Sequence, residues 1–224
     1  MTEGNPDQSL GGRCSRGLMQ IAGVDEVGRG ALFGPVVTAA VLLSPTQQNQ
    51  LAQLGVKDSK QLTPGTRERL AAQIQAIALD CKIGLASVYE IDRLNILQAT
   101  LLAMKRAILK LQPLPDLCLI DGNQRVLGLA IPQATMVQGD RHAISIAAAS
   151  IVAKVWRDQL IVRLALKYPE YDLAQNKGYG TQKHRDALQI HGPSPQHRQS
   201  FKPCQLSLKA ELLESYCHHK WLVK

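Results

Sequence analysis

The chain has 224 residues, of which 45% are hydrophobic, with a mean hydropathy of −0.10 and a net charge of +8. It is long enough to bury a hydrophobic core, and no apolar segment reaches the length of a membrane span. The polar N-terminus lacks the hydrophobic region of a secretory signal, so we expect a cytoplasmic protein with no membrane association.

The cysteines indicate neither a disulfide framework nor a zinc ribbon. There are five, at scattered positions, and none forms a Cys-x-x-Cys pair. The tail Cys217-His218-His219 has metal-ligating residue types but no second ligand pair to complete a site. We therefore expect reduced thiols.

The positive charge lies in the C-terminal third. Residues 1–140 contain 13 Lys and Arg against 12 Asp and Glu, whereas residues 141–224 contain 13 against 6. A basic region beside an acidic centre suits a polyanion that one part binds and another part cuts, although many unrelated proteins are equally basic.

The first predicted strands, 19–26 and 35–43, follow a leader (1–18) that we expect to be disordered. Asp25-Glu26 lies at the end of the first strand, where two buried carboxylates would be costly unless a cation, such as a divalent metal, neutralised them. The alternative is a solvated strand end. Because side chains alternate along a strand, we expect Asp25 on the active face and Glu26 to reach the same cluster from the strand end, where pairing breaks down.

Gly28-Arg29-Gly30 follows these acids directly. Its two glycines let the backbone approach a ligand closely, and Arg29 adds a planar cation at the same point.

A helix is predicted from Pro64 to about 79, with Thr63 as its N-cap. Just ahead of it lie Lys57, Ser59 and Lys60, whose cationic and hydroxyl groups either hold a phosphate or are solvated loop residues.

The middle of the chain predicts a strand at 83–89, a helix at 90–111 and a buried strand at 116–123. Asp121 ends this last strand and Gly122 follows it. An acid in that position lies where open α/β sheets place their ligands, although Asp-Gly also forms plain turns.

A short strand at 133–137 leads to Asp140, just before a long helix at 144–158 whose small residues permit close packing on a sheet. Asp140 therefore either caps that helix or completes a metal site.

The last third predicts helices at 182–190 and 206–216. Before them, Tyr179 stands between two glycines and beside basic residues, so we expect an exposed aromatic ring that stacks on a sugar or base. We expect one catalytic domain, 19–224, with a helical extension from about 170.

These segments together resemble ribonuclease HII, the type 2 ribonuclease H of bacteria and archaea, over about residues 19–201. The motifs that carry the resemblance are Asp25-Glu26-Val27-Gly28-Arg29-Gly30, Asp58-Ser59-Lys60, Asn95-Ile96-Leu97, Ile120-Asp121-Gly122-Asn123, Gly139-Asp140, the Ala-Ala-Ala-Ser-Ile-Val-Ala-Lys helix and Lys177-Gly178-Tyr179-Gly180-Thr181. The sequence departs from the family pattern at Gln138, where lysine is common, and at a variable position, Ala31, but at no catalytic acid.

The resemblance implies a ribonuclease H-like α/β fold, with a central mixed five-stranded sheet flanked by helices and a C-terminal helical part. It also implies a monomer that hydrolyses the RNA strand of RNA–DNA hybrids and incises duplex DNA 5′ of embedded ribonucleotides. The products carry 5′-phosphate and 3′-hydroxyl ends.

The resemblance assigns four acids to catalysis and to binding Mg²⁺ or Mn²⁺: Asp25, Glu26, Asp121 and Asp140. It assigns nine residues to the substrate: Gly28, Arg29, Gly30, Lys57, Ser59, Lys60, Asn95, Lys154 and Tyr179. The Gly-Arg-Gly backbone would contact the ribose 2′-hydroxyl, and Tyr179 would stack on the neighbouring sugar. Because no cysteine or serine lies beside a base, we expect a metal-bound water to attack, assisted by two ions.

Two rival functions remain: a non-catalytic nucleic-acid-binding protein, and a different nuclease or transposase on the same fold. The presence of all four acids disfavours the first. The Gly-Arg-Gly and Lys-Gly-Tyr-Gly segments disfavour the second, because cutting DNA needs no 2′-hydroxyl contact.

Overall fold

The computed structural model describes residues 19–57 and 62–205. The predicted leader (1–18) and the predicted closing helix (206–216) lie outside the described residues.

A mixed five-stranded sheet forms the centre of the protein, in the strand order β3-β2-β1-β4-β5. The strands are β1 (Ile21–Val27), β2 (Val36–Leu43), β3 (Asp80–Ala86), β4 (Leu117–Asp121) and β5 (Gln133–Met136). β2 pairs antiparallel with β1 and β3, whereas β4 pairs parallel with β1 and β5. The predicted α/β fold with a central mixed sheet is confirmed.

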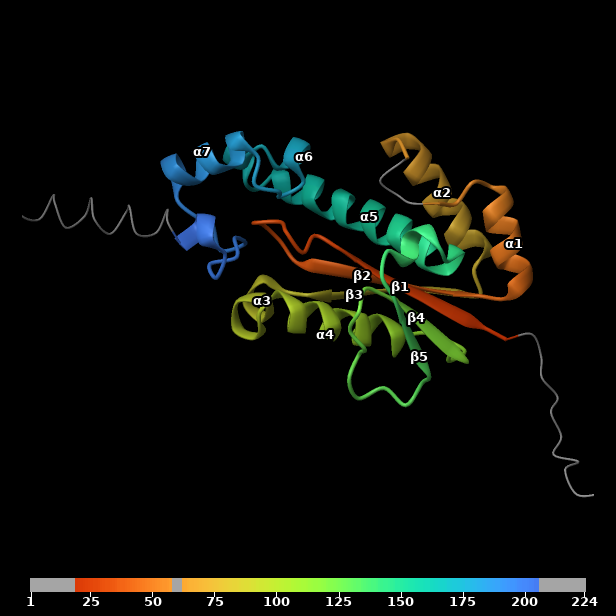
Figure 1. The fold of residues 1–224 in the computed structure, drawn as a ribbon. Coiled ribbons are helices and arrows are strands. Elements are labelled where there is room, and N and C mark those ends of the chain that lie inside the picture. The colour runs from red at the N-terminus through yellow and green to blue at the C-terminus, as the bar shows by residue number, and fades with distance from the viewer. Residues whose placement is uncertain (1–18, 58–61, 206–224) are drawn as a thin grey trace, which may run out of the picture.

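Helices cover both faces of the sheet (Figure 1). One face carries α1 (Pro45–Gln53), α2 (Pro64–Ile77) and α5 (Ile144–Ala165), and the other carries α3 (Val88–Leu94) and α4 (Ile96–Ile108). The core is divided accordingly: alternate residues of β2, such as Val41 and Leu42, pack toward α5 and α4 respectively.

The long helix α5 lies very close to β1. A Cβ atom on Gly23 would come within 2.0 Å of the backbone of Ser145, so no larger residue fits there. The small residues Ala147, Ala148 and Ala149 continue this close contact. The helix is longer than predicted and extends to Ala165.

The C-terminal part packs around the far end of α5 (Figure 1). It contains two short helices, η3 (Pro169–Tyr171) and α6 (Leu173–Asn176), and the longer α7 (Gln182–His191). Phe33, Ile161 and Tyr171 form the centre of its own hydrophobic cluster. The loop after β1 is thereby joined to residues more than a hundred positions later.

The predicted boundary between the third strand and the following helix was wrong, and so was the prediction of a single helix. The strand expected at 83–89 is β3, which ends at Ala86 because Ser87 caps α3 and forms a capping box with Glu90. The single helix expected at 90–111 is two helices, because Asn95 has φ +71° and its side chain accepts hydrogen bonds from Leu97 and Gln98.

The helix α1 was not predicted. Ser44 and Gln47 form its capping box and Pro45 occupies its first position, which together are a recognisable sequence signal. In the part of the chain that the structure describes, no helix is both long and apolar enough to cross a membrane.

Candidate active site

A pocket of about 400 Å³ opens at the end of β1. Its lining combines acidic, basic, glycine and aromatic residues: Asp25, Glu26, Val27, Gly28, Arg29, Gly30, Arg67, Asp121, Asp140, Ser150, Lys154 and Tyr179. We call it the carboxylate pocket.

Three carboxylates converge in this pocket. Asp25, Glu26 and Asp121 each offer an oxygen, and these oxygens all lie within 4.8 Å of one another. The last paired residues of the parallel β1–β4 ladder are Val24 and Ile120, and Asp25 and Asp121 each follow by one position. Neighbouring parallel strands therefore bring two acids together from 96 positions apart in the sequence.

Asp25 and Glu26 leave opposite faces of the sheet, as strand geometry requires. Val27, on the same side as Asp25, packs toward α5, whereas Val24, on the side of Glu26, packs toward α4. The predicted break in pairing is only partial, because the ladder to β4 ends at Val24 while Glu26 still pairs with Thr38 of β2.

Burial and mutual repulsion control the charge of Asp25. The residue is 6% exposed, and burial, followed by the charges of Glu26 and Asp121, raises its pKa well above the usual value. A hydrogen bond from Ser150 acts in the opposite direction. Asp25 is therefore a carboxylate whose ionisation needs an additional positive charge.

Burial also raises the pKa of Glu26, while Arg29 opposes this shift. The two side chains form an ion pair of 3.3 Å, in which Arg29 is 48% exposed and Glu26 only 14%. A cation on the solvent side thus neutralises only part of the negative charge in the pocket.

These three acids fit a hard divalent cation. Carboxylate oxygens are the ligands that Mg²⁺ and Mn²⁺ prefer, and three of them in one place repel each other unless such an ion is bound. Burial, and after it this repulsion from Glu26 and Asp121, raises the pKa of Asp25.

Asp140 lines the same pocket but is not one of the three clustered acids. It lies in the short helix η2 (Gly139–Arg141) and is 8% exposed. It does not cap α5, whose N-cap is Ala143, so that alternative reading is wrong. The backbone N–H of Gly139 donates to Asp121 at 2.8 Å and links this segment to the cluster.

The Gly-Arg-Gly segment and Tyr179 lie side by side. Ala31 and Tyr179 form an isolated β-bridge, and Leu32 N–H donates to the carbonyl of Gly178 at 2.8 Å. Gly28 has φ +87°, and a Cβ atom there would lie 2.2 Å from Nε of Arg157. A glycine is therefore required at this position by both conformation and space.

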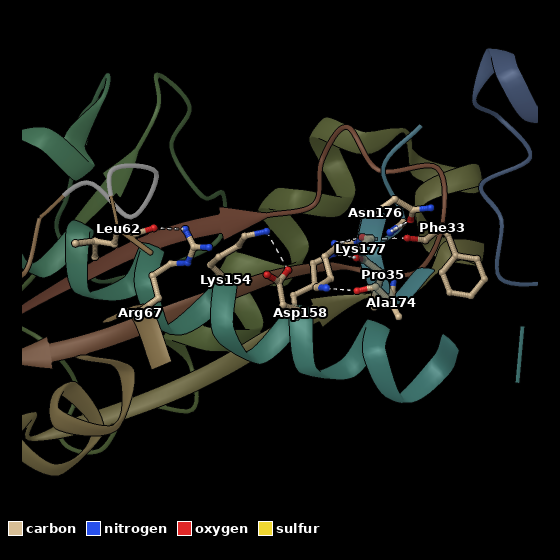
Figure 2. Close-up of polar contacts among 11 residues, drawn as sticks. Phe33, Pro35, Leu62, Arg67, Lys154, Asp158, Ala174, Asn176 and Lys177 are labelled. Atoms are coloured by element: carbon tan, nitrogen blue, oxygen red, sulfur yellow. Dashed lines mark hydrogen bonds and ion pairs between the residues drawn. The ribbon is translucent and has the colours of Figure 1, made fainter. Parts of the chain in front are cut away.

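Tyr179 is half-buried rather than exposed, contrary to prediction. The Lys154 ammonium and the Arg157 guanidinium lie 5.8 and 5.5 Å from the centre of its ring. Lys154 also pairs with Asp158 at 2.9 Å (Figure 2). The ring is thus held in a fixed place at the pocket wall.

A larger groove of about 790 Å³ continues from the carboxylate pocket between α2 and α5. Arg67 and Lys154 line both, and Figure 2 shows these two side chains next to each other. Arg163 and Lys177 extend the basic lining, and Glu68 and Asp158 are its acids.

Some predicted substrate residues are not brought to the carboxylate pocket. Asn95 is exposed and caps α4, and Lys57 is exposed outside the pocket lining. Ser59 and Lys60 lie outside the described residues.

Three residues at the site were not predicted from the sequence: Arg67, Ser150 and Arg157. Ser150, Lys154 and Arg157 recur at helical spacing in α5, so a polar stripe on an otherwise apolar helix was the available signal for two of them. Arg67 gave no comparable signal, because exposed helices commonly carry arginine.

Comparisons with known proteins agree with one another. A family model described as Ribonuclease HII matches residues 22–204. The chain is 64% identical over 189 residues to a protein named Ribonuclease HII from Acaryochloris marina, covering 84% of this chain and 96% of that protein.

Two solved structures are also similar. The ribonuclease H2 from Pyrococcus horikoshii has a TM-score of 0.76 at 28% identity, covering 86% of this chain and 98% of that one. The ribonuclease HII in a PCNA complex from Archaeoglobus fulgidus has a TM-score of 0.68 at 28% identity, covering 80% and 92%.

Proposed function

The chain belongs to the ribonuclease HII family, which hydrolyses the RNA strand of RNA–DNA hybrids and incises duplex DNA at embedded ribonucleotides, and we propose that Asp25, Glu26 and Asp121 perform this reaction. The observation that carries the assignment is the convergence of these carboxylates within 4.8 Å. Cleavage occurs 5′ of the ribonucleotide and leaves 5′-phosphate and 3′-hydroxyl ends.

The family requires a divalent metal, and we infer that this protein uses Mg²⁺ or Mn²⁺. Asp25, Glu26 and Asp121 would hold it, with Asp140 as a fourth acid at the pocket wall. When bound, such ions supply an activated water and stabilise charge on the leaving oxygen. Asp25 and Glu26 gain the positive charge that their raised pKa values call for.

The ribose is recognised at Gly28-Arg29-Gly30, which borders the pocket. Gly30 is exposed, and nothing lies within 4 Å of the position that a Cβ atom would occupy, so a sugar can approach the backbone closely. Tyr179 stacks on the sugar that follows, on the side where an additional 2′-hydroxyl would collide with it.

The phosphate backbone lies along the basic wall. Lys154 and Arg67 line both the carboxylate pocket and the adjoining groove, which makes them contacts for phosphates on either side of the cut. Lys57, Ser59, Lys60 and Asn95 remain predicted substrate contacts.

We further propose that residues 19–224 form one catalytic domain with a helical extension from about 170, acting as a cytoplasmic monomer. The cysteines Cys81, Cys118 and Cys204 are free, as is usual for proteins of a reducing compartment. Burial raises the pKa of Cys118 and Cys204 to about 12 and about 11, which makes both thiols unreactive. Light scattering in solution tests the monomer.

The decisive experiment uses a duplex DNA with a single ribonucleotide, incubated with Mg²⁺, Mn²⁺ or a chelator and resolved on a denaturing gel. We expect a nick 5′ of the ribonucleotide with either metal and none with the chelator. An all-DNA duplex of the same sequence is the control. Equal cutting of both duplexes would favour a general nuclease, and binding without any cutting would favour a non-catalytic protein.

A further inference from the structure

Arg198 is a buried cation that the proposed mechanism does not use. Arg198 is 0% exposed, and the segment around it lies against the loop after β1. Phe33 and His197 form a β-bridge, and Arg198 N–H donates to the carbonyl of Leu32 at 2.9 Å. Arg198 is therefore fixed beneath the loop that contains Gly28-Arg29-Gly30.

The guanidinium of Arg198 holds this loop at both ends. Nη1 donates to the carbonyl of Arg29 at 2.8 Å, and Nε donates to the carbonyl of Gly34 at 3.0 Å. The ring of Phe201 lies 5.1 Å from the guanidinium carbon and packs against it. Only a planar group with several fixed N–H directions makes both bonds at once.

The bond to Arg29 fixes the direction of the next amide. The peptide between Arg29 and Gly30 is trans, so the Gly30 N–H points away from the carbonyl that Arg198 holds. Gly30 is exposed and borders the carboxylate pocket. Within residues 19–57 and 62–205, no protein group accepts a hydrogen bond from this N–H.

The burial of Arg198 is not explained by an ion pair. In the described part of the chain it contacts no carboxylate at ion-pair distance, and its Nη2 has no hydrogen-bond partner. Burial accordingly lowers its pKa to about 9, which still leaves it charged at neutral pH. We attribute the burial of this cation to the two backbone carbonyls that it holds in place, those of Arg29 and Gly34.

We propose that Arg198 is a positioning residue for ribose selection: it holds the Arg29 carbonyl inward so that the Gly30 N–H faces the 2′-hydroxyl of the substrate. This inference rests on the proposed function. Arg198 itself touches no substrate, and it acts through the backbone of the Gly-Arg-Gly turn.

The test compares the affinity for a duplex containing one ribonucleotide with that for the same all-DNA duplex, both measured in chelator so that no strand is cut. Arg198→Lys keeps the positive charge but lacks the planar set of N–H donors that bonds both carbonyls. We expect it to reduce the preference for the ribonucleotide by about tenfold, the effect of one lost hydrogen bond to a 2′-hydroxyl, with unchanged affinity for DNA. In Mg²⁺ its incision should show the same loss.

Two further variants separate positioning from stability. Phe201→Leu removes the ring against the guanidinium and should lower the preference by a smaller factor. Tyr171→Phe is the matched control, because it removes a buried hydrogen bond to the Gly192 carbonyl (2.8 Å) in the same region without touching the turn. It should lower the melting temperature and leave the preference unchanged.

The inference is overturned if Arg198→Lys melts earlier but keeps the wild-type preference, or if both duplexes bind more weakly by the same factor. If Arg198→Lys fails to fold, an unchanged preference in Phe201→Leu overturns it. Failure of the proposed function looks different, because the wild-type protein itself would then fail to incise the ribonucleotide duplex in Mg²⁺.

Discussion

Two neighbouring regions bury charge in opposite ways. The carboxylate pocket gathers three acids, and burial, followed by their mutual repulsion, raises the pKa of Asp25. The second region, which we call the arginine clamp, consists of Arg157 and Arg198, both 0% exposed. In both regions the removal of charge from water is unfavourable, but different groups compensate for it in each region.

The arginine clamp is satisfied by the main chain. Arg157 donates to the carbonyls of Phe33, Pro35 and Lys177 at 2.9–3.2 Å, and these three acceptors lie close together in Figure 2. The carboxylates accept hydrogen bonds from Arg29, Ser150 and backbone N–H groups, but their oxygens lie within 4.8 Å of one another, so each faces other acids. The clamp therefore shapes a loop, whereas the carboxylate pocket is suited to an ion from outside.

The strongest way to break this comparison is to remove one charge from the carboxylate pocket. Asp121→Asn keeps the size of the side chain but weakens metal binding, so we expect incision of a ribonucleotide duplex to fall by about a thousandfold. Single-turnover kinetics on gels measure it. The variant should melt at or above the wild-type temperature without metal, and undiminished incision would refute the assignment of Asp121.

Removing a charge from the arginine clamp should lower the stability of the protein, whereas removing one from the carboxylate pocket should lower its activity. Arg157→Met removes the donor of three carbonyls, two of them in buried hydrogen bonds, and we expect the free energy of unfolding to fall by about 3 kcal/mol. Urea denaturation checks it. The control is the rise in melting temperature on adding Mn²⁺, which the folded variant should retain because its acids are intact. A change below roughly 0.5 kcal/mol, the usual range of surface substitutions, would show that the clamp is not needed for folding.

A buried pair of histidines, His184 and His197, lies beside the arginine clamp and should make the stability of this region depend on pH. Ser194 N–H donates to Nδ1 of His197, so Nε2 of His197 carries the proton toward Nε2 of His184 at 2.9 Å. His184 Nδ1 then donates to the carbonyl of Tyr179 at 3.0 Å. Both rings must be neutral, because a second proton would make two N–H groups face each other.

Burial, followed by the neighbouring His184, lowers the pKa of His197 to about 3. Because its pKa is lower in the folded protein, His197 binds the proton more tightly in the unfolded chain. The contribution of the neutral ring to the free energy of unfolding is therefore fully present above pH 6.5 and is lost as the pH falls toward 3. From the linkage relation we expect a loss of about 2 kcal/mol at pH 5.

Denaturation between pH 7 and 5 measures this slope, and His197→Gln, which cannot titrate, is its comparison. The variant should be less stable at pH 7 yet lose less stability on acidification. Parallel curves for the two proteins would contradict the neutral pair.

The smallest effect concerns Tyr179, where the clamp meets the carboxylate pocket. We expect Tyr179→Ala to lose preference for the RNA-to-DNA junction by about tenfold, a typical value for one stacking contact, while overall binding changes less. Cleavage maps of a hybrid with one junction measure it. Tyr179→Phe keeps the ring and serves as the control, and equal losses of preference and binding in Tyr179→Ala would count against stacking.

Much of the fold was predictable because its signals are local. Alternation and apolar runs located β1, β2 and β4, and Thr63-Pro64 marked the start of α2 correctly. The errors also have local causes. Ser87 ended a strand that composition alone would extend, and Asn95 adopted a positive φ that interrupted a continuous helical pattern.

By itself, the sequence determined which residues carry charge at the ends of strands, and its ordered motifs predicted Asp25, Glu26, Asp121 and Asp140 as one set. Only the tertiary structure decided that Asp140 lies in the pocket wall, outside the three acids whose oxygens converge, and that two cations lie near the Tyr179 ring. It alone revealed the hydrogen bond from Arg198 to Arg29, which joins residues 169 positions apart. Periodicity and capping act over a few residues, whereas a buried guanidinium finds its carbonyls only after distant segments have packed together.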